Sequence, residues 1–171
     1  MPRLVVVLPL IPLQTGQGFA VHDWPLHVTV LAPFTTDAAP GEIADAVASA
    51  VAGQHAITAV AGAGALFGRR HTVPVTLIEE NAALTRLHQA LIDAVRPLVA
   101  SPDEPAFTGR EFRPHVTVKS HGGVTAGQEL ALTQVAVVDM APRSAPGGRF
   151  VLATVPLPAS APPQPSHPHA R

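Results

Sequence analysis

The sequence predicts an α+β protein with two related halves, and three observations support this fold class. Strand-like and helix-like patterns follow one another in the order strand, strand, helix, strands, helix, strand, strands. The tetrapeptide His-Val-Thr-Val occurs twice, at residues 27–30 and 115–118. Of the 171 residues, 47% are hydrophobic and only 13% are charged, which is typical of a folded chain with a substantial core.

The first half begins with an apolar run over residues 4–8 that predicts a buried strand. The wider apolar stretch, residues 4–13, also suggests a signal peptide, but we favour a strand because this stretch is short, contains Pro9 and Pro12 and leads to no convincing cleavage site. A polar loop over residues 14–25 precedes the first motif strand, residues 26–31, which Pro33 is expected to end. Apolar residues at helical spacing then predict an amphipathic helix over residues 40–52, with a glycine as its stop.

The later part of the chain contains a second helix and the second motif strand. Asn81 is expected to cap this helix and Pro97 to close it. A loop over residues 101–109 leads to the second motif strand, residues 114–119, and to a glycine-rich turn. Four further strands are predicted, over residues 56–61, 72–78, 130–138 and 149–155, with the first two separated by the segment 62–70. We expect one domain over residues 1–156 and a disordered, proline-rich tail over residues 157–171.

The repeated tetrapeptide has a definite geometry if it forms strands. Side chains alternate between the two faces of an extended chain, so His27 and Thr29 share one face and the two valines point to the other. The second copy presents His115 and Thr117 in the same way. Two matching sets of an imidazole beside a hydroxyl, each backed by packing groups, predict a polar cleft.

Charge and cysteine content exclude several classes of protein. The net charge is -1, with 11 Lys and Arg against 12 Asp and Glu, so no extended surface for nucleic acid is expected. The chain has no cysteine, which excludes disulfides, thiolate metal sites and a cysteine nucleophile, and fits a reducing, cytoplasmic location. No stretch approaches the roughly 20 apolar residues of a membrane helix, so we expect no membrane association.

Residues 24–30 and 112–118 resemble the paired His-x-Thr/Ser-x motifs of the two-histidine phosphoesterases, the superfamily that includes the 2′-5′ RNA ligase-like cyclic phosphodiesterases. The resemblance spans most of residues 1–156. It implies a bilobal fold in which two pseudo-symmetric lobes of antiparallel sheet plus helices each supply one motif strand to a central cleft. It also implies metal-free cleavage of a phosphodiester.

The residue types support that chemistry independently. Opening a 2′,3′-cyclic phosphate with water needs a base to activate the water and an acid to protonate the departing oxygen, and histidine can do either near neutral pH. His27 and His115 are therefore the candidate catalytic residues. Thr29 and Thr117 are predicted to donate hydrogen bonds to the non-bridging phosphate oxygens, and Lys119 to add positive charge there.

One difference between the two copies suggests which histidine is the base. Lys119 lies four residues after His115, so in a continuous strand the two side chains would point to the same face. The equivalent position of the first copy is Leu31. A nearby cation disfavours a protonated imidazole, so we hypothesise that His115 is the neutral base and His27 the protonated acid.

Weaker candidates for phosphate contacts are Arg69, Arg70 and Arg113. Three aromatic residues near the motifs are predicted to pack in the core rather than to stack on a base: Trp24, Phe34 and Phe112.

These observations predict a metal-independent phosphodiesterase, without a cofactor, that hydrolyses a 2′,3′-cyclic phosphate at an RNA end or on a small nucleotide. Two histidines alone are an incomplete zinc site, so a metalloenzyme is less favoured. Two alternatives stay open. The same histidines could catalyse 2′-5′ RNA ligation, or the cleft could belong to a nucleotide-binding module without turnover. The oligomeric state and the base preference are also open.

Overall fold

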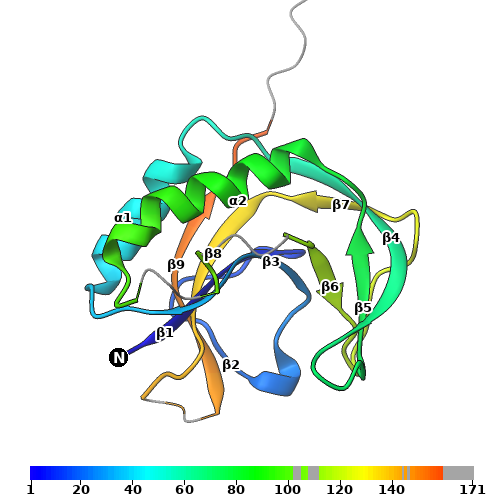
Figure 1. Cartoon of the computed structure of the whole chain (residues 1–171), viewed down its shortest axis with the longest axis horizontal. Coiled ribbons are helices and arrows are strands. Elements are labelled where there is room, and N and C mark those ends of the chain that lie inside the picture. The colour runs from blue at the N-terminus through cyan, green and yellow to red at the C-terminus, as the bar shows by residue number, and fades with distance from the viewer. Residues whose placement is uncertain (102–104, 108–111, 144, 146, 160–171) are drawn as a thin grey trace, which may run out of the picture.

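The computed structural model describes residues 1–101, 105–107, 112–143, 145 and 147–159. In this part of the chain, nine strands form one curled sheet, and two α-helices pack side by side against one of its faces (Figure 1). The strands are β1 (Arg3–Pro9), β2 (Gly18–Ala20), β3 (His27–Thr35), β4 (Ile57–Phe67), β5 (Val73–Ile78), β6 (His115–Thr117), β7 (Glu129–Leu132), β8 (Gln134–Asp139) and β9 (Gly148–Pro156). The helices are α1 (Pro40–Val51) and α2 (Ala82–Val95), with short 3-10 helices η1 (Val21–Asp23) and η2 (Arg96–Leu98).

The strand order is β2-β9-β8-β1-β3-β6-β5-β4-β7, and all pairings are antiparallel. The two motif strands, β3 and β6, are therefore neighbours near the middle of the sheet. They pair at Val28 and Val116 and so join one half of the sheet, β2-β9-β8-β1-β3, to the other half, β6-β5-β4-β7. The predicted α+β class is confirmed, and its two lobes are the two halves of one continuous sheet.

The core has two layers, one on each face of the sheet. Strand β1 contributes to both because its side chains alternate: Leu4, Val6 and Leu8 pack in the layer that contains the helices, and Val5 and Val7 pack in the other. A strand buried on both faces is apolar throughout, which is why the run at residues 4–8 was recognisable.

The motif valines belong to the helix-side layer. Val28, Val30 and Val116 are fully buried there, packed with side chains of α1 and α2. Because alternate residues of a strand point to opposite faces, the histidines and threonines of both motifs face the other side of the sheet. The helices thus fix the orientation of the polar side chains by packing against the valines on the opposite face.

Both predicted helices are confirmed, and the Asn81 side chain caps α2 by accepting a hydrogen bond from the backbone nitrogen of Leu84 at 3.1 Å. The expectation that Pro33 ends the first motif strand is wrong, because β3 continues to Thr35. Between Leu31 and Phe34 two residues of β3 lie opposite a single residue of β1. Such a bulge accommodates a proline, which has no backbone N–H to donate to the ladder.

Two other strand predictions need correction. The segment 62–70 was expected to separate two strands, but β4 runs on to Phe67 and has a register shift between Ala61 and Gly64. A Cβ on Gly62 would lie 3.3 Å from the carbonyl oxygen of Leu77, so this glycine permits close approach to β5 rather than forming a loop. The stretch 130–138 is two strands, β7 and β8, which pair with different partners. The loop expected over residues 14–25 contains β2, which pairs with β9.

The packed chain extends past the boundary expected at residue 156. Leu157 is only 3% exposed, and its backbone nitrogen donates to the carbonyl oxygen of Thr133 at 2.8 Å. The carbonyl oxygen of Pro158 accepts from Ala56 at 2.8 Å. Most of the expected disordered tail, residues 160–171, lies outside the described residues. In the part of the chain that is described, no helix has the length and apolar character needed to cross a membrane.

The buried position of Leu157 predicts that it contributes to stability. We expect Leu157→Ala to lower the free energy of unfolding by about 2 to 5 kcal/mol, because the substitution leaves a cavity in the core. Leu66, which is 57% exposed, provides the matched control. Leu66→Ala should cost at most about 1 kcal/mol. Urea denaturation of the two variants checks this, and equal small losses would show that residue 157 does not belong to the packed domain.

Candidate active site

The pairing of β3 with β6 brings the two motifs face to face. Val28 lies opposite Val116 in an antiparallel ladder, so the residues on either side of this pair also oppose one another. Each histidine therefore lies opposite the threonine of the other motif. The two histidines occupy one diagonal and the two threonines the other, related by an approximate two-fold axis through the valine pair. Diagonal neighbours in such a ladder are about 7 to 8 Å apart, which leaves room for a small anion between them.

Both imidazoles are held by the same kind of hydrogen bond. Nδ1 of His27 lies 2.8 Å from the carbonyl oxygen of Pro25, and Nδ1 of His115 lies 2.9 Å from that of Arg113. A carbonyl oxygen can only accept, so each Nδ1 carries the proton and donates it. Each Nε2 is then the nitrogen that can take up or release a proton. The repeated sequence thus produces two equivalent acid–base groups.

The surroundings of His27 are closed. Its ring stacks on Trp24, with the ring centroids 4.1 Å apart and an angle of 25° between the planes. Trp24 is 6% exposed and belongs to the core layer on this face of the sheet. His27 itself is half-buried.

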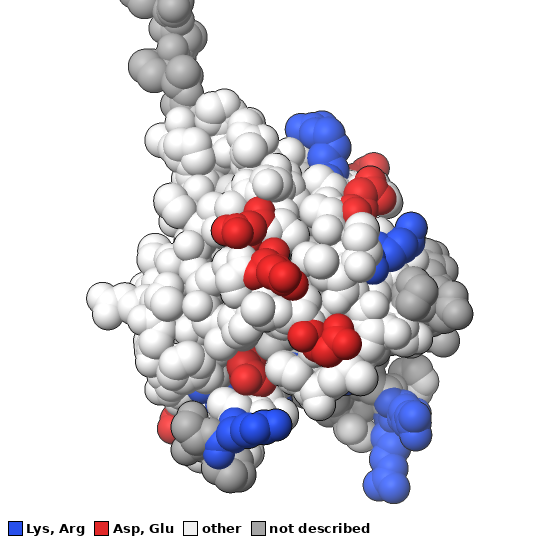
Figure 2. Space-filling view, turned by 90° about the vertical axis from the view of Figure 1, so that its left-hand side faces the viewer, with Lys and Arg blue, Asp and Glu red and all other residues white. Residues whose placement is uncertain are grey.

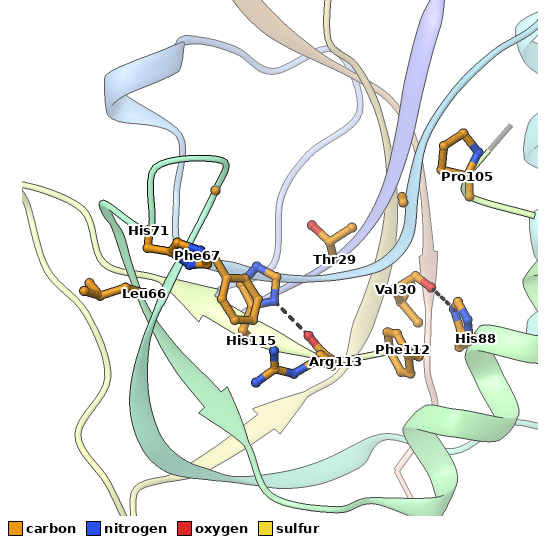
Figure 3. A pocket seen from close by; sticks show the side chains of 13 residues that line it. Thr29, Val30, Leu66, Phe67, His71, His88, Pro105, Phe112, Arg113 and His115 are labelled. Carbon is orange, nitrogen blue, oxygen red and sulfur yellow. Dashed lines mark hydrogen bonds between the residues drawn. The ribbon is translucent and has the colours of Figure 1, made fainter. Parts of the chain in front are cut away.

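His115 instead borders an open cavity of about 470 Å³. Phe67 meets its ring edge-on at a centroid distance of 4.6 Å, and Cζ of Arg113 lies 5.0 Å from the centre of the Phe67 ring. Figure 3 shows His115, Phe67 and His71 at one end of this cavity, with Thr29 between them and the pair formed by His88 and Phe112.

The closed surroundings change the acidity of His27. Burial lowers its pKa from the ordinary value of 6.5 to about 4, although the hydrogen bond to Pro25 acts in the opposite direction. Positive charge on Lys119, His115 and Arg149 lowers the pKa further. His27 is therefore neutral at physiological pH.

The position of Lys119 corrects the assignment made from the sequence. Its Nζ lies 5.9 Å from the centre of the Trp24 ring, and its charge acts on His27. The expected pairing with His115 assumed that the alternation of faces continues through residue 119. It does not, because β6 ends at Thr117 and Lys119 bridges to Gly122 in a tight turn. The positive charge that was expected to keep His115 neutral instead acts on His27.

Arg149 was not identified from the sequence. It lies on β9 opposite Phe19 of β2, and its Cζ is 5.1 Å from the centre of the Trp24 ring. Its Nη1 donates to the carbonyl oxygens of Met140 and Gly148 at 2.7 and 3.1 Å. No motif marks this residue, because its place depends on the pairing of two strands far apart in the sequence.

His88, on α2, also lines the cavity. Its Nδ1 lies 2.8 Å from the carbonyl oxygen of Val30, and its ring stacks on Phe112 at a centroid distance of 4.0 Å. The carbonyl belongs to the part of β3 where the register with β1 shifts. His88 therefore satisfies a backbone acceptor beside the site.

The remaining candidates divide into those near the cavity and those away from it. Thr29 and Arg113 line it, whereas Arg69 and Arg70 are exposed at the turn between β4 and β5. Of the aromatic residues expected in the core, Phe34 and Trp24 are buried, and Phe112 is half-buried at the cavity wall. Within the described residues, no three His, Asp, Glu or Cys side chains gather closely enough to hold a metal ion.

A pair of His-x-Thr motifs on adjacent central strands of a curled antiparallel sheet defines a two-histidine phosphoesterase. The family model of the 2′-5′ RNA ligase superfamily matches residues 15–145. The chain belongs to this superfamily.

Solved structures share the fold at low sequence identity. The protein TT0787 of Thermus thermophilus is 18% identical, with a TM-score of 0.61, over 93% of this chain and 100% of that one. E. coli LigT complexed with 3′-AMP is 17% identical, with a TM-score of 0.54, over 92% of this chain and 99% of LigT. LigT complexed with NADP+ is 18% identical, with a TM-score of 0.55, over 92% and 98% of the two chains. No curated protein sequence matches the chain.

The stack of Trp24 on His27 provides a direct measure of the histidine's pKa. Trp24 is the single tryptophan of the chain, and a protonated imidazole quenches indole fluorescence more strongly than a neutral one. We expect the fluorescence to fall with a midpoint at about pH 4 as the pH is lowered, and the transition to be absent from His27→Gln. Circular dichroism recorded in parallel separates this transition from unfolding. A midpoint near 6.5 would contradict the lowered pKa.

The same shift has a consequence for stability. The unfolded chain binds the His27 proton near pH 6.5 and the folded chain near pH 4. Because the unfolded state binds more protons in this interval, stability falls as the pH is lowered through it.

Proposed function

We propose that this protein is a metal-independent phosphodiesterase that hydrolyses a 2′,3′-cyclic phosphate, at an RNA end or on a small nucleotide, by acid–base catalysis with two histidines. The observation that carries the proposal is the matched pair of imidazoles. Each donates from Nδ1 to a backbone carbonyl, and both lie on the same face of adjacent strands with two threonine hydroxyls beside them.

The diagonal arrangement suits displacement at phosphorus. The attacking and leaving oxygens of such a reaction lie roughly in line on opposite sides of the phosphorus, so a base and an acid are needed on opposite sides. His27 and His115 occupy opposite corners of the four-residue set. Thr29 and Thr117, on the other diagonal, then donate to the non-bridging oxygens, where charge must be held as the geometry changes. Lys119 adds positive charge on the His27 side.

The lowered pKa of His27 supports a proposal for the two roles. A general base must be unprotonated, and burial together with three positive charges keeps His27 in that form. Its Nε2 takes a proton from water as the water oxygen bonds to phosphorus. The bond from phosphorus to the 2′ or 3′ ribose oxygen breaks, and His115 delivers its Nε2 proton to that oxygen. Proton exchange with solvent restores both histidines.

A small or terminal substrate fits the surface better than an extended nucleic acid. Figure 2 shows acidic side chains across the centre of the face where α1 lies and basic ones toward its margins. The cavity beside His115, at about 470 Å³, lies in the range of small-molecule sites. The solved LigT complexes with 3′-AMP and NADP+ contain small nucleotides, which supports a nucleotide ligand here.

We further propose a cytoplasmic location, since a chain without cysteine fits a reducing compartment.

The second candidate is 2′-5′ RNA ligation, which the name of the superfamily favours. In this direction a 5′-hydroxyl replaces water as the nucleophile that attacks the cyclic phosphate. The same base and acid would serve, because in both reactions the nucleophile loses a proton and the departing ribose oxygen gains one.

Substitution of either histidine tests the proposed function. With EDTA present, the protein should convert 2′,3′-cyclic nucleotides to monophosphates, and His27→Ala or His115→Ala should each lower kcat by about 10² to 10⁴. His55 is exposed and lies outside the site, so His55→Ala should retain full activity. Chromatography of the products shows whether the 2′- or 3′-phosphate forms. Binding without product would favour a nucleotide-binding module, and joined RNA ends without hydrolysis would favour ligation.

The pH dependence of kcat/KM tests the roles of the two histidines. A base loses activity as the pH falls through its pKa, so the acidic limb should centre near pH 4 and disappear in His27→Ala. Lys119→Met removes a positive charge and should move this limb to higher pH. An acidic limb that survives in His27→Ala and is lost in His115→Ala would reverse the assignment.

A further inference from the structure

Two cations without acidic partners gather around Trp24. Arg149 approaches the ring from β9 at 5.1 Å and Lys119 from the turn after β6 at 5.9 Å. Within the described residues the only ion pair is His22 with Asp23, so neither cation has a carboxylate within 4 Å. Nζ of Lys119 and Nη2 of Arg149 also have no hydrogen-bond partner there.

This arrangement is costly for a structural feature. Burial lowers the pKa of Arg149, which means that its surroundings disfavour the charge that it carries. Nε of Arg149 and Nε1 of Trp24 are buried without hydrogen-bond partners. Unpaired charge and unsatisfied donors normally destabilise a fold, and their occurrence together is typical of a binding site whose ligand supplies the missing partner.

The cations lie to one side of the four motif side chains. Lys119 follows Thr117 in the direction away from His115, and Arg149 reaches Trp24 through the pairing of β9 with β2. Both cations lie against the Trp24 ring, which stacks on His27. Because Lys119 follows the motif on the side away from His115, an anion bound by this pair of cations would differ from the phosphate that lies between the two histidines.

We propose that Lys119 and Arg149 bind a second phosphate of the substrate. The substrate would be a nucleotide or RNA end that carries, besides its cyclic phosphate, a further phosphate on its 5′ side. This inference rests on the proposed function, since it extends the same site. A free Nη2 and an ammonium group are suitable donors for phosphate oxygens. In this arrangement the reacting phosphate lies between the histidines and the second phosphate lies beside Trp24, where Lys119 and Arg149 contact it.

Calorimetric binding of two product analogues tests the inference without requiring turnover. The wild type should bind adenosine 3′,5′-bisphosphate about tenfold or more tightly than adenosine 3′-monophosphate, because charge-assisted hydrogen bonds are among the stronger polar contacts. Arg149→Met and Lys119→Met should each reduce this ratio toward one. Arg3 is exposed on β1, so Arg3→Met is the matched control and should keep the ratio. If Arg149→Met does not fold, the Lys119→Met variant decides.

The kinetic counterpart compares adenosine 2′,3′-cyclic phosphate with and without a 5′-phosphate. The wild-type ratio of kcat/KM should favour the phosphorylated substrate by about tenfold and fall as ionic strength rises. Equal binding of the two analogues, or a preference that both variants retain, would overturn the inference. Turnover without preference would leave the proposed function intact and overturn only the second phosphate site. Preferential binding without turnover would support the second site and contradict the proposed function.

Discussion

The pairing of Val28 with Val116 is the constraint on which the site depends. It joins the two halves of the sheet at a register that places both histidines and both threonines on the same face, with each histidine opposite the threonine of the other motif. A slip of one residue on either strand would turn that strand's polar side chains into the helix-side layer and its valines toward solvent. Burial of both valines against α1 and α2 opposes such a slip. The packing of apolar groups on one face therefore fixes the geometry of the polar groups on the other.

Two identical tetrapeptides acquire different chemistry because their strands continue into different surroundings. β3 is preceded by Trp24, whose ring stacks on His27. β6 pairs with β5 instead, and His115 lies against Phe67, at the end of the β4–β5 hairpin, beside a cavity. Backbone hydrogen bonds orient both rings in the same way, so the difference between them is electrostatic. One imidazole is kept neutral by burial and positive charge, and the other is accessible to a ligand. A two-fold arrangement can thus support two opposite roles.

The sequence predicted what depends on local periodicity and missed what depends on the register between distant strands. The facing of His27 and Thr29 follows from alternation within a strand, and the cap at Asn81 follows from a single side chain and the turn after it. Alternation fails beyond the end of a strand, which is why Lys119 was assigned to the wrong histidine. Arg149 is brought to Trp24 by the pairing of β9 with β2, and no periodicity within either segment encodes that contact.

Trp24 shows why core and site cannot be separated on this face of the sheet. As predicted, it packs in the core, where it lies with Val5, Val7 and Val151. The same ring covers His27 and holds the two cations near it. The hydrophobic free energy that buries the indole therefore offsets the cost of keeping an unpaired charge and a neutral imidazole together. A looser layer on this side would admit water to His27, raise its pKa toward the ordinary value and weaken the difference between the two histidines. The acid–base asymmetry of the site is in this sense a property of the packing behind it.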